Sequence, residues 1–297
     1  MLDISICIVS YQTRDLLRDA LASIYGQPMQ ASFEVIVVDN ASQDGTQEML
    51  AAEFPQVRLV KNDCNMGYTA PMNQALRLGE GRYLVQLNPD TKVLPGAFDV
   101  LTAYMDSHPK VGICTPKVLN RDGTLQRQCR RSAARPWDVL TYFSGLAARY
   151  PHDRRFGGYL QTFLPEDEIN PVEAVSGSCM FIRREVTAQI GYLDEVYFAY
   201  QEDADFCFRA RKAGWDVIYN PQAQIIHYGG EGGSRNQPYR AIFQWHRSYF
   251  IYYRKNLASD YFFMFNGLYY LMMLAKLLLT LLVTVFRREK IVGSRKP

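Results

Sequence analysis

Hydrophobic runs alternate with amphipathic segments through the first part of the chain. Continuous apolar runs that end in turn-forming residues are typical of buried strands, and apolar residues three or four positions apart are typical of helices. We predict strands at 4–10, 33–39, 57–61, 83–87 and 111–116, and helices at 13–25, 45–54, 70–78 and 96–108. This alternation predicts an α/β fold with a mostly parallel central sheet flanked by helices.

The pattern weakens between residues 120 and 170 and then returns. In the weak region we expect loops with one helix over 136–148. Beyond it we predict strands at 175–183, 217–219 and 224–227, and helices at 186–190 and 202–213. The last of these helices opens with acidic residues, which suit the positive end of a helix.

Polar side chains follow the ends of several predicted strands. In an open α/β sheet, ligands bind outside the carboxyl ends of the strands. The side chains that meet this condition are Ser10, Tyr11, Asp39, Asn40, Asn65, Gly67, Asn88 and Asp90. We therefore expect the ligand site along this edge of the sheet.

Asp90 lies in the segment LNPDT, where a hydrophobic run ends abruptly. An isolated Asn-Pro-Asp triplet is ordinary turn chemistry. A carboxylate fixed at a strand end can also hold a divalent cation, and its hard oxygens suit Mg²⁺ or Mn²⁺. His227 follows a later strand and could supply a second ligand, although a single histidine in such a place is more often structural. We predict a metal site made by Asp90 and His227.

Asp39 and the segment NDCNMGY are candidates for nucleotide binding. Asp39 could cap the turn that follows its strand, or its carboxylate could accept an N–H from a pyrimidine ring. Asn65 and Gly67 could bring backbone close to a ligand, because glycine has no side chain to obstruct it.

Glu202 and Asp203 begin a predicted helix after the aromatic segment VYFAYQ. A carboxylate held there could deprotonate an acceptor hydroxyl as a general base. Favourable interaction with the helix dipole explains acidic residues at this position equally well.

Two further features could contact a diphosphate. Arginine suits bidentate contacts to oxygen, so Arg130 and Arg131 in QRQCRR could bind one, although such a run is usually a solvated surface. The glycines at 229, 230, 232 and 233 could form a loop that closes over a nucleotide.

Composition limits the classes of protein to which the chain could belong. The chain has 297 residues, is 48% hydrophobic and carries a formal net charge of +3, which is too mild a charge to indicate nucleic-acid binding. Six cysteines lie without C-x-x-C spacing, so we expect buried free thiols in a reducing, cytosolic compartment. The amino terminus has no basic region before its short apolar run, so we expect no secretory signal.

Residues 261–286 are almost wholly apolar and have basic residues on both sides. The length suits one crossing of a bilayer, but a single span would carry one basic flank across the membrane, against the usual preference of such residues for the cytoplasm. We therefore favour a helix or hairpin lying in the cytoplasmic leaflet over a true span, and both over an oligomer interface or a buried core helix.

These features predict three regions. Residues 1–230 form a catalytic domain with a nucleotide-binding half (1–118) and an acceptor half (119–230). Residues 231–260 form a loop and a linker helix, and residues 261–297 form a membrane-associating segment with a basic tail.

The motifs together resemble glycosyltransferase family 2, inverting enzymes of the GT-A fold. The resemblance runs from about residue 5 to 227 and rests on SICIVSYQ, VIVVDNASQDGT, NMGY, LNPDT, GSCMFIRREV and YQEDADFCFRARKAGW in this order. It implies that Asp39 contacts uracil or thymine, that Asp90 binds the metal with His227 close by, and that Asp203 is the base. Asn88 departs from the family pattern, since it replaces the first carboxylate of D-x-D.

The resemblance is nearest to the branch with bacterial rhamnosyltransferases, which implies dTDP-rhamnose as donor and a lipid-linked or glycan acceptor. Transferases for UDP-galactofuranose, UDP-glucose or UDP-GlcNAc stay open, as does an inactive membrane adaptor. A nucleotidyltransferase is disfavoured because SYQTR has no glycine for a triphosphate loop, and a processive synthase because the Q-x-x-R-W signature is missing. We also expect no nucleic-acid partner and consider a homo-oligomer possible.

Overall fold

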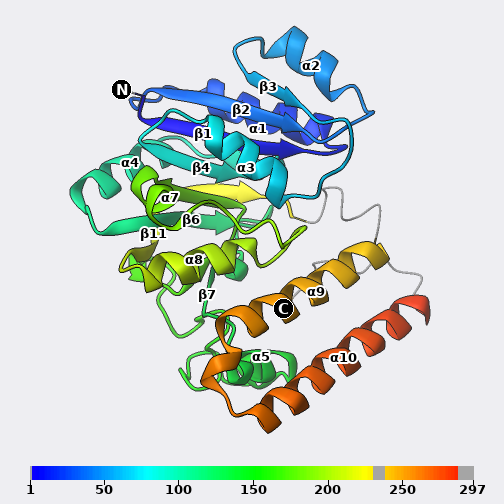
Figure 1. The fold of residues 1–297 in the computed structure, drawn as a ribbon. Coiled ribbons are helices and arrows are strands. Elements are labelled where there is room, and N and C mark those ends of the chain that lie inside the picture. The colour runs from blue at the N-terminus through cyan, green and yellow to red at the C-terminus, as the bar shows by residue number, and fades with distance from the viewer. Residues whose placement is uncertain (1, 230–237, 287–297) are drawn as a thin grey trace.

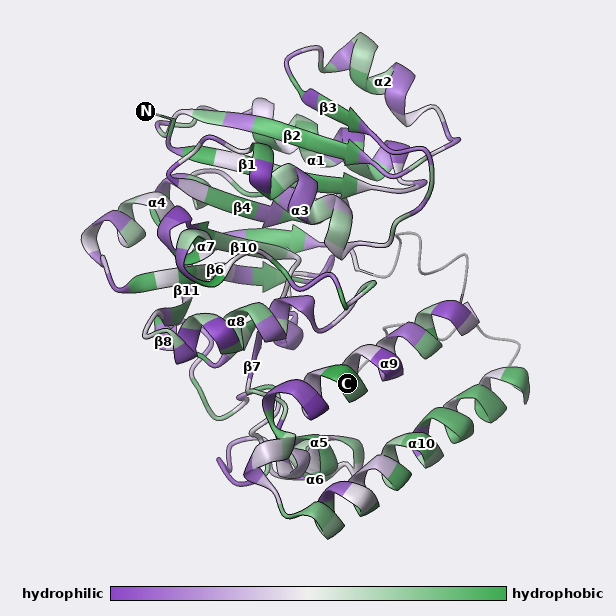
Figure 2. Cartoon of the chain, viewed as in Figure 1, coloured by the Kyte–Doolittle hydropathy of each residue, from purple (hydrophilic) through white to green (hydrophobic). Residues whose placement is uncertain are grey.

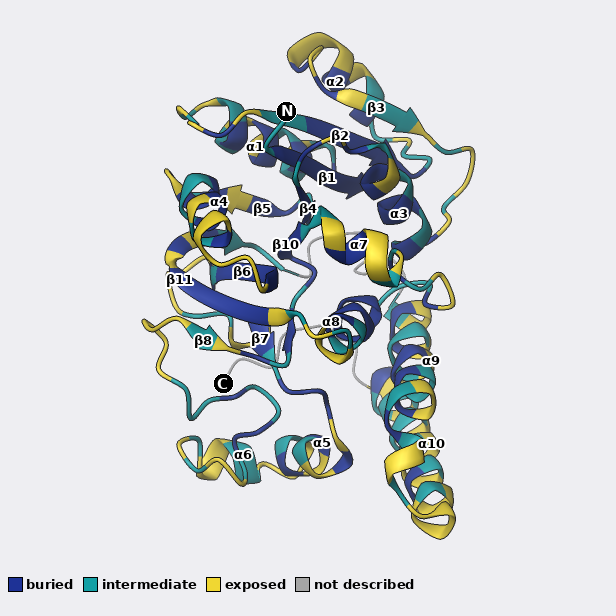
Figure 3. Ribbon diagram, turned by 60° about the vertical axis from the view of Figure 1, so that its left-hand side comes forward, coloured by how far each residue is buried: buried dark blue, intermediate teal, exposed yellow. Residues whose placement is uncertain are grey.

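A computed structural model of the protein describes residues 2–229 and 238–286. Its centre is a nine-stranded sheet with helices on both faces, and two long helices lie beside this body (Figure 1). Along the main path of the sheet the strand order is β3-β2-β1-β4-β10-β6-β11-β5, and β8 pairs with β11. Figure 3 shows the buried strands between α1 and α4 on one side and α3 and α7 on the other.

The amino-terminal half of the sheet is parallel, as the sequence predicts. It consists of β1 (Ile4–Ser10), β2 (Phe33–Asp39), β3 (Arg58–Lys61) and β4 (Tyr83–Leu87). All seven residues of β1 are buried because the strand has neighbours on both edges and helices on both faces. Ser10 pairs with Asp39 in register, so the two strand ends lie side by side.

The other half of the sheet is mixed, since it contains both parallel and antiparallel pairs. The strand β10 (Cys179–Arg183) runs antiparallel between β4 and β6 (Val111–Leu119). The predicted strand 175–183 is divided, because its first residue belongs to β9 (Ala174–Val175), which pairs with β7 (Arg130–Arg131) in a separate ribbon.

The strand β11 (Asp216–His227) joins two strands that the sequence predicts as separate. Its pairing with β6 shifts between Asn220 and Gln224, which accounts for the break in the hydrophobic pattern. The short strands β5 (Thr91–Val93) and β8 (Asn170–Pro171) pair with β11 and were not predicted.

The helices of this body agree with the predicted ones to within a few residues. They are α1 (Arg14–Tyr25), α2 (Thr46–Glu53), α3 (Thr69–Leu78), α4 (Ala97–Ser107), α5 (Pro136–Phe143), α6 (Leu146–Arg149), α7 (Arg184–Ile190) and α8 (Glu202–Lys212). The predicted helix 136–148 is two helices, because Gly145 adopts a left-handed conformation between them. Five of the six free cysteines are buried, and Cys64 is exposed.

Two antiparallel helices complete the described chain. They are α9 (Pro238–Asn256) and α10 (Phe263–Phe286), and Figure 2 shows α10 hydrophobic along most of its length. Among the described residues, α10 is the one helix that is long and apolar enough to cross a membrane, with a mean hydropathy of 2.0. The basic tail of the predicted membrane segment lies outside the described residues.

Candidate functional site

Asp90 and His227 meet at the carboxyl edge of the sheet. Asp90 follows β4 directly before β5, and His227 is the last residue of β11. The pairing of β5 with β11 brings them together, with 3.1 Å between the His227 Nε2 and the Asp90 Oδ1. Their side chains are 12% and 7% exposed. The structure thus places the two predicted metal ligands next to each other.

Gln126 orients the His227 ring, and sequence analysis did not identify it. Its side-chain nitrogen points toward the Asn120 Oδ1 (3.2 Å) and the His227 carbonyl (3.4 Å), so its oxygen accepts a bond of 2.7 Å from the His227 Nδ1. The Nδ1 therefore carries a proton, and Nε2 is the ring nitrogen that faces Asp90. Nothing in the irregular 120–170 region signals this role.

This arrangement fits a divalent cation. The His227 Nε2 and the Asp90 carboxylate face each other here, and both an unprotonated imidazole nitrogen and a carboxylate oxygen are metal ligands. Within the described ranges, no group of three or more His, Cys, Asp or Glu could hold a metal ion. Two protein ligands suit Mg²⁺ or Mn²⁺, which commonly take their other ligands from substrate phosphates and water.

A hydrogen-bonded chain links this corner to the carboxylates of α8. The Asn88 amide contacts the His227 Nε2 at 3.3 Å, and its oxygen accepts from the Tyr68 hydroxyl at 3.0 Å. Gln86 donates to the Tyr68 hydroxyl (3.2 Å) and to the Gly177 carbonyl (3.3 Å). A glutamine inside the buried run of β4 was a sequence signal for such a network, because buried polar residues need partners.

The series of hydrogen bonds that begins at His227 ends at Asp203. The Gly177 N–H donates to its Oδ2 at 2.9 Å, and Arg131 donates to the same oxygen at 2.6 Å. The Oδ1 accepts from the Ala204 N–H at 2.7 Å and keeps one lone pair for another donor. The side chains of Arg131 and Asp203 are 14% and 11% exposed. Although burial alone would lower it, the pKa of Arg131 is raised, because the charge of Asp203 lies beside it.

Glu202 differs from its neighbour. Its Oε2 is buried without a hydrogen-bond partner among the described residues. Burial, together with the charge of Asp203, raises the pKa of Glu202 to about 8. Glu202 therefore holds a proton near neutral pH.

The predicted nucleotide residues at the ends of β1 and β2 lie together. The Ser10 hydroxyl is 3.0 Å from the Thr13 hydroxyl, and Tyr11 follows it at the same edge. The Asp39 carboxylate accepts from the Gln47 side chain at 2.7 Å and from the Ser42 N–H at 3.3 Å. The structure therefore shows the turn-capping role of Asp39, and its contact with a base stays a prediction.

Asn40, Asn65 and Gly67 form a closed set of contacts. The Asn40 amide donates to the Asn65 side chain (3.0 Å) and to the Gly67 carbonyl (2.7 Å), and the Gly67 N–H donates to the Asn65 Oδ1 (2.9 Å). Gly67 has φ +87°, and a Cβ there would collide with the Phe198 carbonyl. The close approach predicted at this glycine is thus to Phe198, within the protein.

Arg130 and Arg131 both have hydrogen-bond partners within the protein. Arg130 is 2% exposed, donates to the Leu164 and Pro165 carbonyls, and lies over the Tyr219 ring. A buried guanidinium held in this way is structural, and Arg131 is bound to Asp203. The placement of both gives no support to the predicted diphosphate contacts. Apart from Gly229, the predicted glycine loop lies outside the described residues.

A cavity of about 400 Å³ lies beside the 65–67 loop. It is lined by residues of α3, α9 and the 195–198 segment, among them Met66, Phe198, Gln244 and Arg247. The Gln244 Oε1 has no hydrogen-bond partner among residues 2–229 and 238–286, so a polar group of a ligand could bind it.

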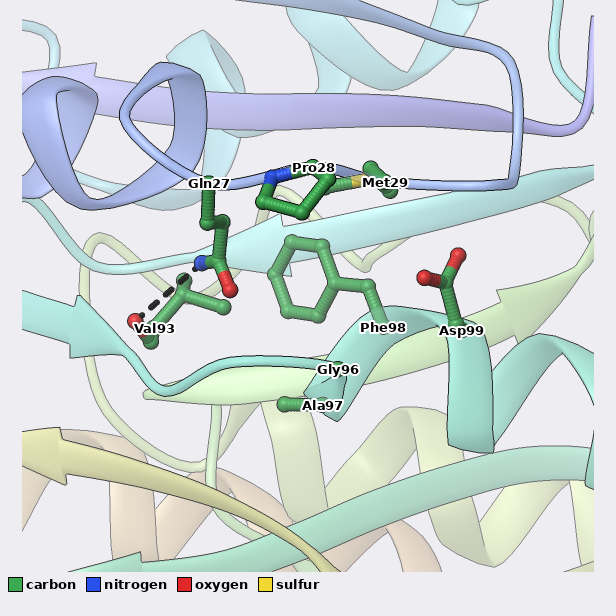
Figure 4. A pocket seen from close by; sticks show the side chains of 8 residues that line it. All are labelled: Gln27, Pro28, Met29, Val93, Gly96, Ala97, Phe98 and Asp99. Atoms are coloured by element: carbon green, nitrogen blue, oxygen red, sulfur yellow. Dashed lines mark hydrogen bonds between the residues drawn. The ribbon is translucent and has the colours of Figure 1, made fainter.

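A second crevice, between α1 and α4, does not resemble a ligand site. Figure 4 shows the rings of Pro28 and Phe98 side by side in it, and the side chain of Gln27 is bonded to the Val93 carbonyl. Closely packed apolar rings leave no room for a ligand, so this crevice is part of the packing.

Residues 5–191 match the family described as Glycosyl transferase family 2. The match covers more than half of the chain. The chain belongs to this family. The fold predicted from the sequence resemblance, GT-A, is also that of its structural neighbours.

Two curated relatives of this glycosyltransferase cover most of its length. The N-acetylglucosaminyl-diphospho-decaprenol L-rhamnosyltransferase of Mycobacterium tuberculosis is 29% identical over 255 residues, which are 82% of this chain and 81% of that protein. The low-salt glycan biosynthesis hexosyltransferase Agl10 of Haloferax volcanii is 28% identical over 231 residues, which are 76% of this chain and 67% of that protein.

Solved structures share the fold at lower identity. The mannosyltransferase PcManGT from Pyrobaculum calidifontis, in complex with GDP-Man and Mn²⁺, has a TM-score of 0.54 and 19% identity, with 83% of this chain and 62% of that chain covered. GalNAc-T7 with UDP, GalNAc and Mn²⁺ has a TM-score of 0.60 and 14% identity, with 86% and 48% covered.

Proposed function

We propose that this glycosyltransferase moves a single hexose, rhamnose from dTDP-rhamnose, to a lipid-linked or nascent glycan acceptor with inversion at C1. The reaction would belong to bacterial surface polysaccharide synthesis. The observation that carries the proposal is the hydrogen-bonded chain from His227 to Asp203, because it holds a candidate metal site and a candidate base in one fixed arrangement.

The relatives support this choice of substrates. One relative is named for the transfer of L-rhamnose to a diphospho-decaprenol acceptor, and its similarity extends over most of both chains. Transfer from UDP-galactofuranose, UDP-glucose or UDP-GlcNAc is the alternative within the same reaction class.

In the proposed reaction, the acceptor hydroxyl donates to the free lone pair of the Asp203 Oδ1. The hydroxyl oxygen forms a bond to C1 of the sugar as the bond from C1 to the diphosphate oxygen breaks. The hydroxyl proton passes to Asp203, and the nucleoside diphosphate leaves. Asp203 suits the base because Arg131 and the Gly177 N–H stabilise its ionised form, whereas Glu202 holds a proton near neutral pH.

Asp90 and His227 would hold Mg²⁺ or Mn²⁺ together with the diphosphate oxygens of the donor. A cation bound there stabilises the charge on the departing diphosphate, worth several kcal/mol in sites of this type. Gln126 accepts from the His227 Nδ1 and so keeps the Nε2 aimed at the site. Asn88 takes part through its amide, which fixes the same ring.

The proposal includes a place in the cell and a division of the chain. The protein would act at the cytoplasmic face of the membrane, where a lipid-linked acceptor is available. Residues 1–230 would form the catalytic domain, with nucleotide-binding (1–118) and acceptor (119–230) halves. Residues 231–260 would link this domain to the membrane-associating segment 261–297.

A donor screen tests the proposal. The purified protein is incubated with Mn²⁺, membrane lipid carrying a polyprenyl-diphosphate-linked sugar, and dTDP-rhamnose or one of the UDP-sugars. We expect release of dTDP that depends on the acceptor, and a product of inverted anomeric configuration. UDP release from another donor would identify that alternative, and no release from any donor would indicate an inactive adaptor.

A further inference from the structure

The exposed residues of α10 differ in polarity from its buried ones. Every exposed residue of this helix is apolar, and among the most exposed are Phe263 (72%) and Phe286 (78%), one at each end. Asn266, Lys276, Thr280 and Thr284 are all half-buried or buried, as are the two tyrosines, Tyr269 and Tyr270. A helix that faces water would show the opposite division.

The polar groups of α10 find their partners inside the protein. The Asn266 amide donates to the Ala258 carbonyl at 2.9 Å, and Thr280 and Thr284 each donate to the carbonyl one turn earlier at 2.7 Å. Lys276 lies 3.1 Å from the His246 Nε2 and over the rings of Phe143 and Trp245. Inward contacts of these four side chains are what a hydrocarbon environment requires.

The helix α9 fixes the direction of α10. Contacts between the two helices include the hydroxyls of Tyr249 and Tyr269, 2.7 Å apart, and the pair of His246 and Lys276. The helix α9 is itself bound to the catalytic domain, since Ser248 donates to the Ala199 carbonyl at 2.8 Å. Figure 1 shows α10 running alongside α9 throughout. A perpendicular span would carry α9 and its exposed arginines into the hydrocarbon.

We infer that α10 inserts lengthwise into one leaflet of a lipid bilayer, with its axis in the membrane plane and its apolar face toward the acyl chains. The inference rests on the proposed function for the choice of membrane, the one that carries the acceptor. A second copy of the chain fits this face less well, because interfaces between proteins keep a polar rim, and α10 exposes no polar side chain.

Depth measurements along α10 test the insertion. Met264, Leu271, Leu278 and Val285 repeat every seven residues, and all are about equally exposed, between 58% and 65%. Each is replaced singly by cysteine in the full chain carrying Cys64→Ser and is labelled with a fluorescent probe. The protein is bound to vesicles of phosphatidylethanolamine and phosphatidylglycerol that contain lipid quenchers near the headgroup or near the bilayer centre.

We expect the four probes to lie at one shallow depth. A span would place the two inner probes about 10 Å deeper than the outer ones, given a rise of about 1.5 Å per residue. A dimer interface would leave all four unquenched and would double the mass in light scattering. Either of these results overturns the inference.

Vesicle binding of substituted proteins gives a second test. Leu271→Glu combined with Leu278→Glu should weaken binding at least about tenfold, because amphipathic helices bind through their apolar area. Ile169→Glu, at an exposed apolar residue of the catalytic domain, is the control and should change binding less than about twofold. Equal binding of both variants contradicts the inference. Neither test measures enzymatic activity. A negative result in either one can therefore be told apart from a negative result in the donor screen.

Discussion

Replacing Arg131 by methionine should destabilise the protein and impair the candidate base together. The substitution keeps most of the aliphatic stem and removes the guanidinium that bonds to Asp203 at 2.6 Å and to the Val175 carbonyl at 3.0 Å. The variant thus leaves a carboxylate, only 11% exposed, without its counter-ion.

The magnitude follows from distance and burial. At an effective dielectric constant of about 20, two unit charges separated by 2.6 Å attract by about 6 kcal/mol. Part of this is offset by the desolvation of both groups. Removing one partner of a buried pair costs about 3–5 kcal/mol, because the other charge stays buried. We expect Arg131→Met to lower the free energy of unfolding by this amount.

Urea unfolding measures the loss, with Arg155→Met as the matched control. Arg155 pairs with Asp153 at 2.7 Å, but its side chain is 78% exposed, so breaking that solvent-screened pair should cost far less. Adding Asp203→Asn to Arg131→Met removes the unpaired charge and should restore part of the stability. The reasoning is refuted if Arg131→Met costs no more than the control, or if the second substitution restores nothing.

Three other predictions concern metal affinity, pH dependence and backbone conformation. Gln126→Met should weaken Mn²⁺ binding about 10- to 100-fold in titrations followed by electron paramagnetic resonance. Gln126→Glu keeps the acceptor oxygen and should bind Mn²⁺ nearly as well as the native protein. Equal Mn²⁺ affinities of the two variants would contradict the role of Gln126. Because burial raises the pKa of Glu202 to about 8, the folded protein keeps a proton there that the unfolded chain releases, so this contribution to stability is complete below the unfolded pKa and is lost as the pH rises toward 8. Glu202→Gln cannot ionise, so its free energy of unfolding should rise relative to that of the native protein between about pH 5 and 8, and a constant difference would argue against the raised pKa. Gly67→Ala should lower the free energy of unfolding, measured by thermal unfolding, by about 1–3 kcal/mol more than Gly123→Ala does. Both glycines have positive φ, but only Gly67 faces the Phe198 carbonyl. Equal losses of stability would show that this contact is unimportant.

The sequence predicts the amino-terminal half of the fold well because hydrophobic periodicity and strand-ending turns are local signals. The strands β1, β2 and β4 have the predicted bounds. The direction and neighbours of β10 were not predicted, because they depend on pairing with β4 and β6, which are far from it in the chain.

The candidate site shows the same division. Asp90 and His227 could be named from strand ends alone, and the structure places them together. The partners of Arg130 and Arg131 could not be foreseen, because a run of arginines indicates positive charge but not where each guanidinium points. Gln126 lies in an irregular segment, and its importance follows only from the ring that it contacts.

Turnover by Asp203→Asn tests the central claim most directly. The protein is assayed for acceptor-dependent release of nucleoside diphosphate from dTDP-rhamnose, with donor affinity and thermal unfolding measured on the same sample to show that the site is folded. We predict that turnover falls about 10²- to 10⁴-fold, the usual contribution of a general base, while donor affinity stays within a few-fold of the native value. Transfer at the native rate by this variant would contradict the account, because Asp203 could not then be the base.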